Sequence, residues 1–286
     1  MGRVDVERIP YDEYSNRQLA AVPLAVLAVA LLIILGAYVL TGTPVDLGIE
    51  FTGGTELRFD AGGASDAEVR ETFSEVEIEN LRSVGNEREL VVGPDVDSER
   101  LETLAEDAGY DVLSIESRSA NFGADAQQQA IIGLTIAFVG MSVLVALIFR
   151  TFVPSLAIVA SAFSDIAIPI ALMNVLGIDL TLGAVAALLM LIGYSVDSDI
   201  LLNNHVLRRH GGFYESSYRA MRTGVSMTLT SIAAMTTMAV VAWLFGIELM
   251  FDIALILVFG LSADLLNTYM LNMSLLRWYK YEGVAK

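Results

Sequence analysis

The sequence of 286 residues contains no cysteine, only two lysines and only two histidines. Without cysteine, neither a disulfide framework nor a thiolate metal site can form. The two histidines, His205 and His210, are too few for a histidine-rich metal cluster, and no GxxxxGKS or GxxxxGKT string indicates a phosphate-binding loop. We therefore expect neither a metal site nor a cofactor.

Acidic residues, in contrast, are abundant and unevenly placed. The chain is 55% hydrophobic with a mean hydropathy of +0.59, yet its net charge is −17. Residues 41–125 contain 21 acidic and six basic residues, a net charge of −15. Such a surface repels itself in dilute buffer, and molar salt shortens the screening length to about 3 Å. This predicts a salt-adapted host; an acidic surface that binds a basic partner is the alternative.

Six segments are long and apolar enough to cross about 30 Å of hydrocarbon as helices. They are residues 19–40, 130–149, 152–175, 180–202, 224–245 and 251–273. The apolar core of the first is too long for a cleavable signal peptide, and no cleavage site is evident at its end. The sequence predicts a membrane bundle of six transmembrane helices.

Basic residues follow one side of this bundle. They flank the spans at Arg3, Arg8, Arg17, Arg150, Arg208, Arg209, Arg219, Arg222, Arg277 and Lys280. The opposite loops, 174–183 and 245–252, contain no base. By the positive-inside rule we expect cytoplasmic termini, residues 1–18 and 277–286, in a multi-pass protein of the cell membrane. Residues 41–125 then form an extracytoplasmic domain, and residues 126–276 hold the second to sixth spans.

The pattern of residues 41–125 predicts a small α+β domain. A strand is expected over Val45 to Phe59, and Ser65 with Glu68 predicts a capping box at the start of a helix. The remaining expected elements are a hairpin of Leu81 to Val84 and Glu89 to Val92 around Gly85-Asn86, a helix from about Ser98, and a strand over Tyr110 to Ser117. The order βαββαβ is the ferredoxin-like plan.

Two strings resemble signatures of a known family. GIEFTGGTELRF, residues 48–59, resembles the string that follows the first span in SecD and SecF proteins, which usually have Asp where this chain has Glu50. GYSVDSDILLNNHVLRR, residues 193–209, is similar to the fourth-span signature of SecF proteins. The signature residues are Glu50, Phe51, Thr52, Gly53, Gly54, Gly193, Tyr194 and Ser195. Since one span, an outer domain and five spans follow in the same order, the resemblance covers nearly the whole chain.

This resemblance implies a half of the resistance-nodulation-division (RND) fold, with no enzymatic activity. It implies a partner, SecD, that supplies six further spans, and work on the Sec translocon channel. There the complex draws a translocating polypeptide outward with an ion gradient. Membrane lipid surrounds such a protein, and no nucleic acid is involved. The acidic, lysine-poor composition further suggests a halophilic archaeal version.

Four carboxylates fall inside the spans, away from the basic residues at their ends: Asp165, Asp197, Asp199 and Asp264. Ionisable residues within a membrane are costly and are candidates for an ion relay. The alternative is that each is a neutral acid that hydrogen-bonds to a neighbouring helix. Asn267 shares a helix face with Asp264, so it is a candidate supporting residue.

In the fourth span, Asp197 and Asp199 project about 200° apart around the helix. Asp197 aligns with Gly193 and Asn204, whereas Asp199 aligns with Ser195 and Asn203. Gly193 permits close approach of another helix, so we expect the Asp197 stripe to face the functional interface. The Asp199 stripe is expected to contact spans of this chain.

The bacterial members of the family differ at this point. Their fourth-span acid, which follows an asparagine, corresponds to Ser198 here, and their basic residue in the fifth span has no obvious equivalent. The bacterial relay therefore cannot be transferred unchanged.

Two other functions fit the sequence less well. A half-transporter of the same superfamily for lipids or small molecules would leave the FTGG string unexplained. An intramembrane aspartyl protease needs two convergent carboxylates, and none of the intramembrane aspartates has the Tyr-Asp or Gly-x-Gly-Asp context of that class. The Gly53-Gly54 pair predicts a tight bend beside the membrane and no phosphate site.

Overall fold

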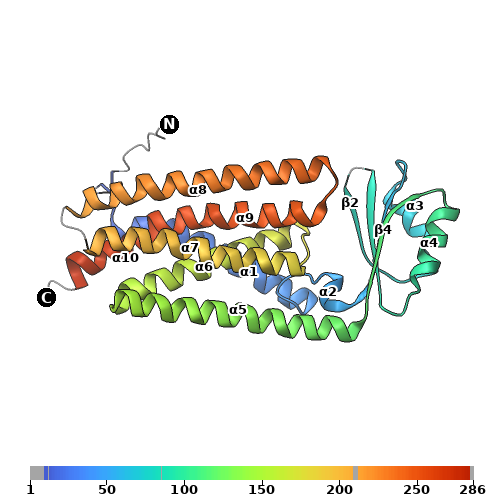
Figure 1. Ribbon diagram of the computed structural model, residues 1–286, viewed down its shortest axis with the longest axis horizontal. Coiled ribbons are helices and arrows are strands. Elements are labelled where there is room, and N and C mark those ends of the chain that lie inside the picture. The colour runs from blue at the N-terminus through green and yellow to red at the C-terminus, as the bar shows by residue number, and fades with distance from the viewer. Residues whose placement is uncertain (1–9, 12, 85, 209–211, 284–286) are drawn as a thin grey trace. The chain divides into compact units, whose positions relative to one another are not determined.

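The computed structural model describes residues 10–11, 13–84, 86–208 and 212–283. Predictions that involve Arg3, Arg8, Gly85, Arg209 and His210 lie outside these residues. The chain forms two compact units, one of Met1–Asp46 with Gly133–Lys286 and one of Leu47–Ile132. Most of the long helices belong to the first unit and the β-sheet to the second, as the labels of Figure 1 show, while the long helix Ala120–Phe149 begins in the second unit and continues into the first.

The first unit is a helical bundle, and the six apolar helices found among the described residues confirm the predicted number of spans. They are α1 (Asn16–Thr41), α5 (Ala120–Phe149), α6 (Phe152–Leu176), α7 (Leu182–Arg208), α8 (Phe213–Leu244), and a sixth span of Glu248–Gly283 that begins with α9 (Glu248–Leu266). Helices α5 and α8 begin about ten residues before the predicted spans. Their first turns are polar, so they continue the helix without contributing to the apolar signal.

Helices α6, α7 and α9 form the centre of the bundle. More than half of the apolar window of α6 and of α7 is buried, against less than a fifth for α1, α5 and α8. Leu188 and Leu191 of α7 pack with Ile256 and Leu257 of α9, in a cluster that includes Met173 of α6. The peripheral helices instead expose large apolar side chains, as expected of a surface that faces lipid.

The sixth span is not a regular α-helix throughout. After α9, a π-helical segment, η1 (Asn267–Asn272), precedes α10 (Met273–Trp278) and a second π-helical segment, η2 (Tyr279–Gly283). A π-helical turn inserts an extra residue between hydrogen-bonded partners and is frequent at functional sites. Most of the η1 side chains are buried, including two asparagines and a threonine.

The second unit is a two-layer domain with the predicted βαββαβ order. Its elements are β1 (Gly54–Asp60), α3 (Asp66–Thr72), β2 (Ile78–Val84), β3 (Glu87–Val92), α4 (Ser98–Asp107) and β4 (Asp111–Arg118). The antiparallel sheet has the strand order β2-β3-β1-β4, which is the ferredoxin-like topology. Both helices cover the same face of the sheet (Figure 1).

Local sequence rules explain where these elements begin and what they bury. Ser65 and Glu68 form the predicted capping box at the start of α3. Leu57 and Phe59 of β1 point to one face, where they pack against Val69 of α3 and Leu101 of α4. Alternation along the strand therefore places the apolar side chains under the two helices.

The predicted strand over Val45 to Phe59 is wrong in its first part. Residues Ile49–Thr52 form the short helix α2, and the strand begins at Gly54. Gly53 and Gly54 have φ angles of 75° and 124°, which side chains with a Cβ rarely adopt. A Cβ at Gly54 would also lie 2.5 Å from the carbonyl oxygen of Val92. The glycine pair thus ends the helix and turns the chain into β1, as predicted for a tight bend.

Candidate functional site: a buried carboxylate cluster

Three of the four intramembrane aspartates meet at the centre of the bundle. Asp165 of α6, Asp199 of α7 and Asp264 of α9 are each at most 2% exposed. The fourth, Asp197 of α7, is exposed on the surface of this chain. The helix therefore separates the two aspartates of the fourth span as its geometry predicts.

Asp165 is held by one hydrogen bond from each of the other two central spans. Its Oδ2 accepts a hydrogen bond of 2.6 Å from Ser195 Oγ of α7. Its Oδ1 accepts one of 2.6 Å from Asn267 Nδ2 of η1. These two contacts tie α6, α7 and the sixth span together around a single carboxyl group.

The carboxyl group of Asp199 accepts two hydrogen bonds from η1. Thr268 Oγ1 and Asn272 Nδ2 donate to Asp199 Oδ1 at 2.8 and 2.7 Å. Asn203, one turn along α7, donates to the backbone carbonyl of Asp199 at 2.8 Å. The expectation that the Asp199 stripe contacts spans of this chain is therefore confirmed.

Asp264 contacts the fourth span through a residue that carries no charge. Ser198 Oγ donates to the Asp264 carboxyl group, with distances of 2.7 and 2.9 Å to its two oxygens. Thr268 Oγ1 lies 3.1 Å from Asp264 Oδ1. The same threonine hydroxyl therefore touches both Asp199 and Asp264.

This shared hydroxyl constrains where protons can lie. A hydroxyl group has one proton, so Thr268 can donate to Asp199 or to Asp264 but not to both at once. The second contact becomes a hydrogen bond only when that carboxyl group is protonated and donates to Thr268. If both contacts are hydrogen bonds, the geometry therefore requires a proton on at least one of the two carboxyl groups.

Several buried oxygens around the cluster have no hydrogen-bond partner among the described residues. They include Asp199 Oδ2, Asn203 Oδ1, Asn267 Oδ1 and Ser161 Oγ. Within the described part of the chain, no lysine or arginine forms an ion pair with any of the three aspartates. The same residues contain no group of three or more His, Asp or Glu side chains arranged to hold a metal ion. The cluster thus has spare acceptors and no cation of its own.

The Asp197 stripe has the opposite character. Gly193, Asp197 and Asn204 all lie on the exposed side of α7. A Cβ at Gly193 would have no neighbour within 4 Å, so no described residue of this chain packs against that glycine. Within the bundle, close approaches occur instead at other glycines, among them Gly260, where the side chain of Leu191 occupies the space of a Cβ.

The sequence pattern missed two of the cluster's main hydrogen-bond donors, Thr268 and Ser198. A signal for Thr268 does exist, because Asp264, Thr268 and Asn272 recur every four residues on one helix face. Ser198 has no such periodic signal, although the resemblance places it where the bacterial members of the family have an acid. Its position between two aspartates placed it on neither predicted stripe.

The other signature residues lie in the second unit and form a structural corner. Phe51 of α2 is buried, and Thr52 Oγ1 donates to the Gly53 carbonyl at 2.8 Å. The start of α5 packs closely here, because a Cβ at Gly123 would lie 2.6 Å from the Phe51 carbonyl oxygen. Glu50 is only partly buried.

Known proteins show the same architecture. A crystal structure of SecDF, a translocon-associated membrane protein from Thermus thermophilus, superimposes with a TM-score of 0.79 at 21% sequence identity. The match covers 98% of this chain and 40% of that chain. It confirms the predicted fold, a six-helix membrane unit with a small ferredoxin-like domain.

Sequence relatives cover the chain from end to end. Residues 99–282 match the family described as protein export membrane protein SecD/SecF, C-terminal. Proteins named protein-export membrane protein SecF are 63% identical in Haloferax volcanii, over 98% of both chains, and 59% identical in Haloquadratum walsbyi, over 100% of both chains. These two organisms fit the predicted halophilic archaeal origin. The chain therefore belongs to the SecF family of protein-export membrane proteins.

Proposed function

We propose that this chain is the SecF subunit of a SecDF complex that assists protein translocation through the Sec channel from the outer side of the membrane. An ion gradient, of protons or of sodium ions, drives the cycle. The observation that carries the coupling is the cluster of Asp165, Asp199 and Asp264, three buried carboxyl groups without a cation among the described residues. Two of them, Asp199 and Asp264, share the Thr268 hydroxyl. Carboxyl groups in such surroundings are typical of ion pathways in transport proteins.

Within the cluster, we assign the transferred charge to Asp199 and Asp264. Thr268 lies between them and can reverse its hydrogen bond as a proton leaves one carboxyl group and reaches the other. Ser198 occupies the position of the bacterial acid, and it donates to Asp264. The fourth span thus has no carboxylate at residue 198, and Asp264 of the sixth span places one beside that residue.

The partner in this proposal is SecD, which supplies six further spans. The exposed stripe of Gly193, Asp197 and Asn204 supports this, because a carboxylate that faces lipid in the middle of a span is unfavourable. A helix of the partner would cover the stripe and contact Asp197. The SecDF chain of Thermus thermophilus, of which this chain covers 40%, is long enough to include such a second half.

The orientation in the membrane follows from the distribution of basic residues. Both termini are cytoplasmic in this proposal, and the domain of Leu47–Ile132 lies outside, where the polypeptide emerges. An Arg100→Cys variant tests it on a chain that has no other cysteine. The thiol should react with a membrane-impermeant maleimide on intact cells. Labelling only after lysis would show that residue 100 faces the cytoplasm and would contradict the proposed orientation.

The coupling is tested by export from cells in which each variant replaces the native chain. Asp199→Asn and Asp264→Asn keep the size of the side chain but remove its titration, and each should abolish the stimulation of reporter secretion. Asp252→Asn is the matched control, since it makes the same change on α9 three turns from Asp264 and should secrete normally. Membrane levels of this chain and of SecD are measured by immunoblot in parallel.

Normal secretion by both cluster variants would contradict the relay. A separate experiment identifies the ion. An ionophore selective for protons or for sodium ions is added to cells with the native chain, and the one that lowers reporter secretion shows which gradient is used. Failure of SecD to co-purify with the native chain would contradict the proposed complex separately from the relay.

A further inference from the structure

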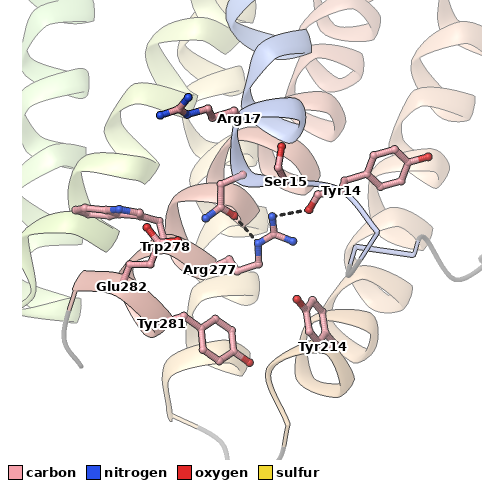
Figure 2. Close-up of a pocket in the computed structure, with 9 residues that line it drawn as sticks. Tyr14, Ser15, Arg17, Tyr214, Arg277, Trp278, Tyr281 and Glu282 are labelled. Atoms are coloured by element: carbon pink, nitrogen blue, oxygen red, sulfur yellow. Dashed lines mark hydrogen bonds between the residues drawn. The ribbon is translucent and has the colours of Figure 1, made fainter. Parts of the chain in front are cut away.

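A second polar site lies at the end of the bundle where α1 begins and the sixth span ends. It is a cavity of about 680 Å³. Its walls are Tyr14, Ser15, Asn16, Arg17, Tyr214, Arg277, Trp278, Tyr281 and Glu282 (Figure 2). This volume is far larger than a single small ion requires and falls in the range of sites for organic ligands.

A buried guanidinium forms the base of this cavity. Arg277 of α10 is only 8% exposed. It donates hydrogen bonds to Asn16 Oδ1 and to the backbone carbonyls of Tyr11 and Tyr14, of which Figure 2 shows the one to Tyr14. These bonds use three of its five N–H groups, so two have no hydrogen-bond partner among the described residues.

The charge of Arg277 finds no compensating acid among the described residues. No carboxylate of the described residues forms an ion pair with it, although Glu282 lines the same cavity. A buried charge is costly unless an opposite charge or a full set of hydrogen bonds accompanies it. The site therefore favours an anionic ligand that accepts the two remaining N–H groups.

The wall opposite α10 is firmly attached to the bundle. The phenol of Tyr11 donates to the backbone carbonyl of Tyr269 at 3.0 Å. Burial, together with the nearby Tyr218, raises the pKa of Tyr11 well above its usual range, so the phenol keeps the proton that it donates. The segment that supplies Tyr14, Ser15 and Asn16 is thus held in place beside Arg277.

The position of the cavity along the spans matches the headgroup layer of a membrane. The sixth span has 36 residues, whereas about 20 suffice to cross the hydrocarbon core. Its last turns, with Arg277, therefore extend beyond the core. Trp278, Tyr14 and Tyr281 are 42 to 53% exposed there, and such aromatic side chains are enriched at membrane interfaces.

We propose that this cavity binds the phosphate of an anionic phospholipid headgroup. Arg277 contacts the phosphate from the base of the cavity, and the exposed Arg17 adds positive charge at its rim. Basic pockets at the ends of membrane helices are known to select anionic headgroups. The remaining volume accommodates the polar group that esterifies the phosphate, which a free phosphate ion would leave unfilled.

The test uses the full chain in detergent with Trp278 as the reporter. The chain has two tryptophans, so Trp243→Phe leaves only the one in the cavity wall. Its fluorescence is followed while short-chain phosphatidylglycerol, short-chain phosphatidylcholine or inorganic phosphate is added. We expect saturable binding of phosphatidylglycerol, with the zwitterionic lipid and the free ion at least tenfold weaker.

Variants that each remove one charge test whether phosphatidylglycerol binds in the cavity. Arg17→Gln should weaken phosphatidylglycerol binding about fivefold, since one basic residue near the surface is worth about 1 kcal/mol. Glu282→Gln should strengthen it by a similar factor. Arg222→Gln is the matched control, because it removes the same charge from an exposed site outside the cavity and should leave the affinity unchanged.

Equal binding of phosphatidylglycerol and phosphatidylcholine would overturn the proposal. So would equal effects of Arg17→Gln and Arg222→Gln, because the attraction would then be non-specific. Free phosphate that binds as tightly as phosphatidylglycerol, with the same dependence on Arg17 and Glu282, would keep the phosphate site but overturn the lipid as its source.

Discussion

The two units of this protein differ in where their acidic side chains lie. In the domain of Leu47–Ile132, most aspartates and glutamates are exposed, and several pair with arginine, as Asp66 does with Arg88 at 3.1 Å and Glu75 with Arg100 at 2.6 Å. In the bundle, Asp165, Asp199 and Asp264 are buried, and serine, threonine and asparagine are their partners.

The difference shows what each set of carboxylates contributes. Exposed pairs are screened by salt and are worth about 0 to 1 kcal/mol each, so the acidic domain depends on its core and on the solvent. Buried carboxyl groups are screened much less and interact strongly with a proton or a small cation. Acidity in one unit thus serves compatibility with salt, and in the other it serves the proposed transport function.

The largest effect is expected from the hydroxyl between the two buried carboxyl groups. Thr268→Val keeps the shape of the side chain but removes the group that contacts both Asp199 and Asp264, so stimulated secretion should be lost. Thr268→Ser retains the hydroxyl and should preserve most of it. Secretion of a reporter, normalised to the membrane level of each variant, measures both. Equal secretion by the two variants would show that the buried carboxyl groups do not communicate through this hydroxyl.

In the acidic domain, the apolar core should matter more than any ion pair. Phe59→Ala removes a fully buried ring that packs against Phe73 and should lower the free energy of unfolding by about 3 to 5 kcal/mol. Leu113→Ala, at a side chain that is 50% exposed, should change it by less than about 0.5 kcal/mol. Chemical denaturation of residues 47–132 in molar KCl compares them. Similar losses would mean that the core does not stabilise this domain.

Salt should affect the two units differently. Raising KCl from about 0.1 M to about 2 M screens the acidic surface and should raise the melting temperature of residues 47–132 by at least about 5 °C. Circular dichroism at both salt concentrations gives the shift. The cluster in the bundle is buried, so salt should not restore secretion to Thr268→Val cells. An unchanged melting temperature would remove the argument for salt adaptation of the domain.

The smallest effect concerns the cap of α3. Ser65→Ala should lower the free energy of unfolding by about 1 kcal/mol at neutral pH, because it removes the serine hydroxyl that caps the Glu68 N–H at the start of α3. Hydrogen bonds from the Ser65 backbone N–H and hydroxyl lower the pKa of Glu68. The stabilisation that depends on the charged Glu68 carboxylate is therefore present above the usual glutamate pKa and is lost as the pH falls through the lowered value. Denaturation at pH 7 and near pH 3 should show a smaller difference between native and variant at the lower pH.

Sequence reasoning predicted the six spans, the βαββαβ order and the separation of Asp197 from Asp199. It was wrong at Ile49–Thr52, where an apolar run resembling a strand forms a helical turn because Gly53 and Gly54 end it. It also gave no role to Thr268 or Ser198. A hydroxyl beside an apolar helix face has the same sequence pattern whether it packs, bonds to its own helix or donates to a carboxyl group of another span.

What the sequence determined by itself is local. Hydropathy over about 20 residues marks a span, a capping box marks the start of α3, and 100° per residue separates two aspartates on α7. Only the tertiary structure brought Asp165, Asp199 and Asp264 together from three different helices. Their meeting depends on how α6, α7 and α9 pack, with the side chain of Leu191 in contact with Gly260. It also depends on the π-helical segment η1, whose polar side chains donate hydrogen bonds to the carboxyl groups. Such contacts arise from interhelical packing, which no short stretch of sequence specifies.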